Sequence, residues 1–198
     1  PGEYISFRFK PKGPESDEIE PREYSISHDL INNQYRISVR NIGLVSDYVN
    51  NKLSVGDLIP VHAPVGTMKY DFLSKKPKIA VLAGGIGITP MITIMQSALR
   101  DNKSVELYYS NKSLKREPFR EELEHLGKLY PNQFTMKTFI SEESQKLTTD
   151  DLKHLSQQVY DVYLLGPVSY MHEFKTYLTN EGFDDIKMEF FGPTDPDC

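Results

Sequence analysis

The residues best suited to chemistry lie in a glycine-rich turn, AGGIGITP, at residues 83–90. The turn joins a short apolar strand predicted over residues 78–83 to a helix predicted over residues 90–99. Glycines allow tight turning and close approach of the backbone to a ligand, and a helix N-terminus with a threonine cap and a first-turn proline attracts anions. The pattern predicts nucleotide binding, although such a turn can also serve only to pack strand against helix. The candidate residues are Gly84, Gly85, Gly87, Thr89 and Pro90.

Two further short motifs carry weaker signals. Gly166-Pro167 follows a strand predicted over residues 162–165 and could border the same crevice, or simply end the strand. Residues 22–25 read REYS at the start of a strand, where an arginine beside an aromatic ring could bind a phosphate and a ring together. Alternation along a strand places Arg22 and Tyr24 on one face. In isolation this motif also fits an ordinary exposed strand.

The elements that must position these motifs fall into two halves. The first half predicts short strands at residues 4–9, 24–27, 35–40 and 58–62 with one helix at 45–53, which is typical of a small antiparallel barrel or sandwich. The second half alternates strands at 78–83, 104–109, 134–140, 162–165 and 187–191 with helices at 90–99, 118–129, 149–157 and 168–180. This alternation predicts a doubly wound parallel sheet of five strands. The expected domains are 1–74 and 77–198.

Composition narrows the functional classes. The chain has 198 residues and a net charge of -5 with acidic and basic residues interspersed, which argues against nucleic-acid binding. Its one cysteine, Cys198, argues against disulfides and favours the cytoplasm. No apolar run approaches the ~18 residues of a membrane span, and the histidines lack metal-ligand spacing. Because the chain opens at Pro1 in an apparent strand, we interpret it as part of a longer protein that has lost the first barrel strands.

Five motifs resemble those of the ferredoxin-NADP reductase superfamily in order and spacing, over essentially the whole chain. They are Arg22-x-Tyr24-Ser25, Gly43-x-Val45-Ser46, the turn at 84–90, Gly166-Pro167 and the segment 189–193. Two of them, Gly166-Pro167 and Glu189 within the sequence EFFGP at 189–193, look most like the reductase part of flavohaemoglobins. The resemblance implies an FAD-binding barrel followed by an NAD(P)H-binding α/β domain. It also implies an enzyme that passes a hydride from NAD(P)H to FAD and electrons onward to haem in an upstream globin domain. Flavohaemoglobins are nitric oxide dioxygenases.

The resemblance assigns the barrel motifs to FAD. It implies that Arg22 holds an FAD phosphate, that Tyr24 lies along the flavin and that Ser25 hydrogen-bonds near its reactive nitrogen. Glu189 would sit near the flavin and the route to haem, so Tyr24, Ser25 and Glu189 form the expected catalytic set. Phe191 would stack on the flavin ring until nicotinamide displaces it. The FAD pyrophosphate would meet a helix start at Gly43, Val45 and Ser46.

The α/β motifs are assigned to the coenzyme. The turn from Gly84 to Pro90 would line the NAD(P)H site, and Gly166 with Pro167 would border the nicotinamide. The loop at 110–116, SNKSLKR, contains no carboxylate for a ribose hydroxyl. Its hydroxyls and cations, Ser110 and Lys112 among them, favour the 2′-phosphate of NADPH over NADH, although a solvated basic loop has the same composition.

Three departures from the family pattern keep other functions open. Leu165 stands where the family usually has a cysteine beside the nicotinamide, Ile42 replaces the first glycine of the pyrophosphate motif, and Glu23 replaces a common glutamine. One alternative is a reductase that serves a separate iron–sulfur or haem partner. The other is a nucleotide-binding module without redox activity, which Leu165 would then mark.

Overall fold

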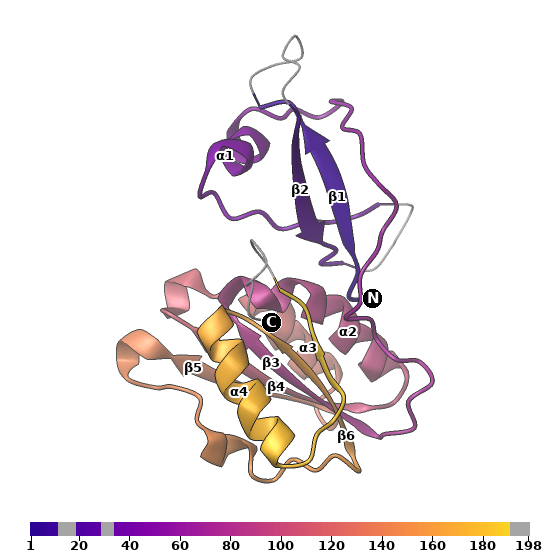
Figure 1. Cartoon of the computed structure of the whole chain (residues 1–198), viewed down its shortest axis with the longest axis vertical. Coiled ribbons are helices and arrows are strands. Elements are labelled where there is room, and N and C mark those ends of the chain that lie inside the picture. The colour runs from indigo at the N-terminus through magenta and orange to yellow at the C-terminus, as the bar shows by residue number, and fades with distance from the viewer. Residues whose placement is uncertain (12–18, 29–33, 191–198) are drawn as a thin grey trace.

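The computed structural model describes residues 1–11, 19–28 and 34–190, which build two sheets. Figure 1 shows a small part containing β1, β2 and α1 standing on a larger part containing the other labelled elements. We call these the β-rich half and the α/β half. Along the chain, residues 70–77 connect the two halves and lead into β3.

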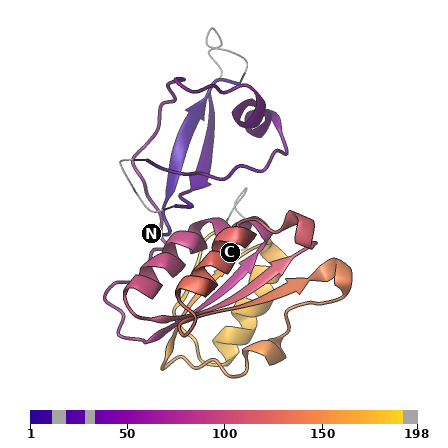
Figure 2. The ribbon, with the colours of Figure 1, turned by 180° about the vertical axis from the view of Figure 1, so that it is seen from behind.

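The α/β half contains a parallel sheet with the strand order β5-β4-β3-β6-β7. Helices α2 and α3 cover one face, and α4 covers the other (Figures 1 and 2). The chain order reverses between the neighbours β3 and β6, so the crevice at their carboxyl ends is the switch point of a doubly wound sheet. The elements are β3 (Lys78–Gly84), α2 (Ile88–Arg100), β4 (Ser104–Asn111), α3 (Arg120–Leu129), β5 (Phe134–Ile140), β6 (Tyr160–Leu165), α4 (Val168–Asn180) and β7 (Ile186–Met188).

The β-rich half is built on an antiparallel pair, β1 (Tyr4–Phe9) and β2 (Glu20–Ser25), with the helix α1 (Leu44–Asn51). Aromatic rings hold these three elements together. Phe9 lies 5.5 Å from Phe7, 6.3 Å from Tyr24 on β2 and 6.3 Å from Tyr48 on α1, measured between ring centroids. Such ring contacts stabilise a small core that has few other apolar residues.

Two predicted strands do not form in the described structure, and one predicted helix is shorter than expected. Residues 35–40 and 58–62 form no strand and contact β-structure only through single bridges, Ile26 to Ile37 and Phe7 to Val61. Pro60 has no N–H to donate to a ladder, which explains the second case. The helix predicted at 149–157 is only a 3₁₀ turn, Thr149–Leu152.

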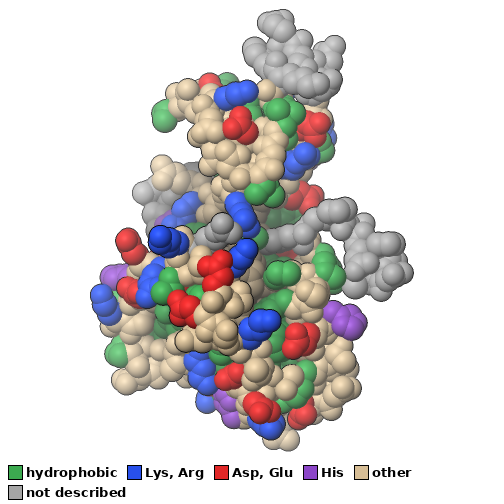
Figure 3. Space-filling model, turned by 90° about the vertical axis from the view of Figure 1, so that its left-hand side faces the viewer, with side chains coloured by type: hydrophobic (Ala, Val, Ile, Leu, Met, Phe, Trp, Pro, Cys, Tyr) green, Lys and Arg blue, Asp and Glu red, His purple; other side chains and the backbone are tan. Residues whose placement is uncertain are grey.

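The main core lies in the α/β half. The stretch of β3 from Ile79 to Ala83 is fully buried, and Met91, Ile92 and Met95 of α2 belong to the same core. Basic and acidic side chains are interspersed on the face shown in Figure 3. Among the described residues, no helix is both long and apolar enough to span a membrane. The same residues contain no group of three or more histidine, cysteine, aspartate or glutamate side chains that could hold a metal ion.

Candidate functional site

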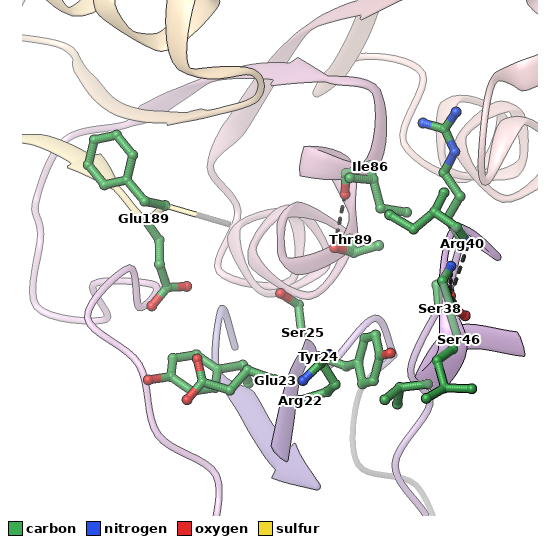
Figure 4. A pocket seen from close by; sticks show the side chains of 16 residues that line it. Arg22, Glu23, Tyr24, Ser25, Ser38, Arg40, Ser46, Ile86, Thr89 and Glu189 are labelled. Atoms are coloured by element: carbon green, nitrogen blue, oxygen red, sulfur yellow. Dashed lines mark hydrogen bonds between the residues drawn. The ribbon is translucent and has the colours of Figure 1, made fainter. Parts of the chain in front are cut away.

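A pocket of about 670 Å³ lies between the two halves. Its walls come from the β-rich half, from the start of α2, and from the two residues that directly follow β7 (Figure 4). It brings together residues that the sequence predicted from distant motifs. The lining residues are Tyr4, Arg22, Glu23, Tyr24, Ser25, Ser38, Arg40, Ile42, Gly43, Leu44, Val45, Ser46, Ile86, Thr89, Glu189 and Phe190.

Two buried polar atoms in this pocket lack partners. Ser25 is 6% exposed, and its Oγ has no hydrogen-bond partner in the described part of the chain. The same is true of Glu189 Oε2, and Figure 4 shows the Glu189 carboxyl directed into the pocket. Because an unsatisfied buried polar group is unfavourable, these two atoms fit a bound molecule that carries hydrogen-bonding groups.

The surroundings of Glu189 in the pocket raise the pKa of its carboxyl. Burial raises the pKa of the Glu189 carboxyl above the ordinary value of 4.5, the backbone N–H of Thr67 opposes this by hydrogen bonding to it, and the nearby Glu23 raises it further. Glu189 therefore keeps a proton to higher pH than a free glutamate does. Burial also raises the pKa of Tyr24, so its hydroxyl remains a neutral donor.

Arg22 and Tyr24 are held in different ways on β2. Arg22 Nη1 donates to the Pro21 carbonyl at 2.7 Å and to Glu20 Oε2 at 3.1 Å, while the side chain stays 48% exposed. The Tyr24 ring packs 6.1 Å from Phe7. The strand therefore presents a solvated cation and a fixed aromatic ring to one pocket, which Glu23 and Ser25 from the same strand also line.

A short loop before α1 forms another wall. Ser46 Oγ accepts the N–H groups of Ile42 and Gly43, each at 2.9 Å, and donates to the Gly43 carbonyl at 2.9 Å. The Ser46 hydroxyl thus organises the loop. Gly43 has no atom within 4 Å of the position where a Cβ would stand, so its surface is open, while Val45 is buried.

The glycines of the central turn have two different roles. A Cβ on Gly87 would stand 2.4 Å from the Leu165 carbonyl oxygen, and one on Gly84 would stand 2.8 Å from Pro167. A Cβ on Gly166 would stand 3.1 Å from the Cα of Gly84. These three glycines let the β3–α2 and β6–α4 turns touch. Gly85 differs, since it has φ +55 and nothing within 4 Å of its Cβ position, so it is the member of the turn open to a ligand.

The predicted cap of α2 is wrong in detail. The helix begins at Ile88 with Gly87 as its N-cap, after a 3₁₀ turn over Gly85–Gly87. Thr89 therefore lies inside the first turn, where its hydroxyl donates to the Ile86 carbonyl at 3.0 Å and its side chain reaches the pocket. Pro90 lies in the same turn, where its missing N–H does no harm.

The residues expected to choose the coenzyme lie at the end of β4. Ser110 pairs with Gly84 across the sheet, and its buried Oγ has no hydrogen-bond partner among the described residues. Lys112 is exposed. Glu117, which follows this loop, is buried and paired with Arg120 at 3.4 Å, so it is turned toward α3. Neither Ser110 nor Lys112 lines the pocket described above.

Several pocket residues were missed by the sequence analysis. Tyr4, Ser38 and Arg40 line the pocket but belong to no predicted motif, while Ile86 and Phe190 lie inside predicted motifs without having been named as site residues. Ser38 and Arg40 share the parity of one strand face, which is the only signal that could have found them. The coenzyme-turn residues Gly84, Gly85, Gly87, Pro90, Gly166 and Pro167 do not line it. Phe191, predicted to stack on the flavin, lies outside the described residues.

Comparisons with known proteins match both halves. A sequence family described as "Oxidoreductase NAD-binding domain" matches residues 81–175. A flavohaemoprotein of Candida norvegensis is 65% identical over 198 residues, which is 100% of this chain and 51% of that protein. A flavohaemoprotein of Candida albicans is 39% identical over 98% of this chain and 52% of that protein. The chain therefore spans about half the length of these relatives.

A solved structure agrees over a more complete length. The flavohaem-like FAD/NAD-binding domain of nitric oxide dioxygenase from Vibrio cholerae is 32% identical. It superposes with a TM-score of 0.82, covering 97% of this chain and 85% of that one.

Proposed function

We propose that this chain, which belongs to the flavohaemoprotein family and forms its NAD(P)H- and FAD-dependent reductase part, holds FAD in the 670 Å³ pocket and receives NAD(P)H at the neighbouring switch point. One observation carries the assignment of the pocket. It joins Arg22, Tyr24 and Ser25 from the β-rich half with Thr89 and Glu189, and its buried Ser25 and Glu189 oxygens lack partners. We further propose domain boundaries at 1–74 and 77–198.

Each pocket residue then has a defined task. The exposed Arg22 guanidinium binds an FAD phosphate, and the open backbone at Gly43 admits the pyrophosphate near the start of α1. Tyr24 packs along the ring system, and Ser25 supplies its free hydroxyl to a ring nitrogen. Glu189 places a buried carboxyl, with a pKa raised by that burial, beside the ring. FAD, when bound, supplies the conversion from two-electron to one-electron transfer.

The coenzyme site rests on the switch point. The open face of Gly85 and the N-terminus of α2 accept the coenzyme pyrophosphate, and Gly166 with Pro167 border the nicotinamide. Ser110 and Lys112 favour NADPH, because a hydroxyl and a cation suit a 2′-phosphate. Leu165 keeps the wall of this crevice apolar.

The activity of the longer protein follows from its relatives. Because one relative is named as a nitric oxide dioxygenase, we propose that electrons pass from this chain to a haem globin domain of the same protein for nitric oxide detoxification. A cytoplasmic location fits a chain whose one cysteine is Cys198.

The flavin assignment is tested by measuring FAD binding to Arg22→Ala. Removing a charge-assisted hydrogen bond of ~1.5–3 kcal/mol should weaken FAD binding about ten- to hundredfold. Arg8→Ala is the control, because Arg8 is an exposed arginine of the same half that does not line the pocket. Quenching of FAD fluorescence measures both affinities. Equal affinity in the two variants would remove Arg22 from the flavin site.

A further inference from the structure

Arg36 of the β-rich half makes the most extensive polar contact between the two halves that we find in the described residues. Its Nη2 lies 3.0 Å from Glu122 Oε2 on α3, and its guanidinium carbon lies 5.2 Å from the centre of the Phe119 ring. The carboxylate of Glu122 also accepts from Gln96 of α2 at 3.3 Å. One arginine is therefore connected to both helices that cover this face of the parallel sheet.

The other side of Arg36 is fixed to the wall of the pocket. Its Nη2 donates to the Ser27 carbonyl, and its Nε donates to Ser27 Oγ at 3.3 Å. Ser27 also hydrogen-bonds Ser38 through their hydroxyls at 3.1 Å, and its N–H donates to the Arg36 carbonyl at 2.9 Å. Ser38 lines the pocket, and so does Ser25, two residues before Ser27. The guanidinium thus connects a pocket wall directly to α3, and through Glu122 to Gln96 of α2.

The residue on which Arg36 stacks has an unusual backbone. Phe119 has φ +62 and ψ +17, a left-handed conformation that a bulky side chain seldom adopts. Its carbonyl accepts the Leu123 N–H at 2.9 Å and so begins α3. This conformation places the ring beside Arg36 while the helix starts, and a strained residue of this kind persists only where its surroundings fix it.

From these contacts we propose that Arg36 is a positioning residue, which through Glu122 and Phe119 sets how the flavin wall stands against the coenzyme half. The proposal rests on the proposed function, since only then must two cofactors meet between the halves. A partly exposed ion pair adds little to global stability, and the side chains of Arg36 and Glu122 are 39% and 25% exposed. Its effect should therefore appear in reactivity more than in unfolding, because transfer rates depend steeply on the placement of the reacting groups.

The test compares Glu122→Gln with Glu124→Gln. Both variants remove one carboxylate from α3, but the ion pair of Glu124 is with Arg120 of the same helix, at 3.0 Å, and not with the β-rich half. With FAD bound, Glu122→Gln should lower the limiting rate of flavin reduction by NADPH about tenfold. The dissociation constant for NADPH should change less than about twofold, because the coenzyme site itself is intact. Glu124→Gln should match the original protein in both quantities.

Two further readouts separate positioning from a general loss of structure. Salt at about 1 M, where charges are screened within ~3 Å, should slow the original protein toward Glu122→Gln and leave that variant unchanged. Arg36→Lys, which keeps the charge but loses the Nε hydrogen bond and the stacked guanidinium, should be faster than Arg36→Gln and slower than the original protein. The double variant Arg36→Gln/Glu122→Gln should be no slower than either single variant, as expected for partners in one interaction. Equal rates in Glu122→Gln and Glu124→Gln, or additive losses in the double variant, would overturn the proposal.

Hydrogen exchange without cofactors keeps the proposal testable if flavin reduction itself is absent. The Ser27 amide, which donates to the Arg36 carbonyl, should exchange several times faster in Glu122→Gln than in Glu124→Gln. A protein that shows this difference but never reduces flavin would refute the proposed function and retain the positioning role. Unchanged Ser27 exchange would refute the positioning role, whatever the reductase activity.

Discussion

Replacing Gly87 by alanine should destabilise the protein although the backbone there suits any residue. Gly87 has φ -59 and ψ -10, a right-handed conformation in which alanine is not strained. The new methyl group would instead stand 2.4 Å from the Leu165 carbonyl oxygen and 2.8 Å from the Leu165 carbonyl carbon. Both atoms belong to the backbone at the end of a central strand, so the two turns must separate to admit the methyl group.

The expected size follows from the cost of overpacking, about 1–3 kcal/mol. For a chain of this length, that loss lowers the melting temperature by about 2–12 °C. Gly127→Ala is the matched control. A Cβ at Gly127, within α3, would meet only Phe134 at 3.7 Å, an ordinary contact. Alanine is a better helix former than glycine, so this variant should gain about 0.5–1 kcal/mol.

Thermal unfolding of the two variants by circular dichroism decides the matter, because the predicted changes have opposite signs. Gly87→Ala should also bind NADPH more weakly, since the displaced turns border the proposed coenzyme crevice. If Gly87→Ala melts at or above the temperature of the original protein, the β3–α2 and β6–α4 turns are not in contact as described.

Three other changes have defined outcomes. Ser25→Ala should raise the stability of the cofactor-free protein by about 1 kcal/mol, because it removes an unpartnered buried hydroxyl, and it should weaken FAD binding. Calorimetry measures the stability and titration measures the FAD affinity. A variant with unchanged stability and unchanged FAD affinity would contradict the prediction. Burial opposes ionisation of Glu106, but hydrogen bonds from His154, Tyr160 and Tyr108 lower its pKa overall. The Glu106 carboxylate therefore stabilises the folded protein at pH values above the ordinary pKa of 4.5, and this contribution is lost as the pH falls through the lowered pKa. Urea unfolding across acid pH should therefore show a flatter acid limb for Glu106→Gln, and an unchanged limb would rule this out. The pH dependence that Glu189 contributes to stability has the opposite sign, because its raised pKa makes the folded protein less stable as the pH rises above 4.5. Glu189→Gln should remove that decline in the same experiment.

The parallel sheet could be predicted because its central strands, β3 and β6, are buried on both faces. Runs such as residues 79–83 are apolar throughout, and glycine or proline ends several of them, so strand positions follow from the sequence to within a few residues. The helix predicted after β5 failed for a local reason. Thr148 and Asp151 form a capping box, a sequence signal of a helix start, but the turn ends at Leu152, and His154 instead reaches Glu106 at 2.8 Å.

The β-rich half was harder to predict because its strands have few neighbours. Residues 35–40 have the composition of a strand, yet only Ile37 bridges to β-structure. Their side chains have other partners: Arg36 reaches α3, while Ser38 and Arg40 line the pocket. Such contacts join residues far apart in the chain and depend on how the two halves pack. Strand propensity alone does not contain that information.

The most direct measurement is the absorption spectrum of the chain with bound FAD as NADPH is added without oxygen. The flavin band should bleach, and Arg22→Ala should lose this response through weaker FAD binding. A chain that binds both FAD and NADPH and keeps its flavin band unchanged would contradict the central claim. It would mean that the two nucleotide sites exist without the reaction between them.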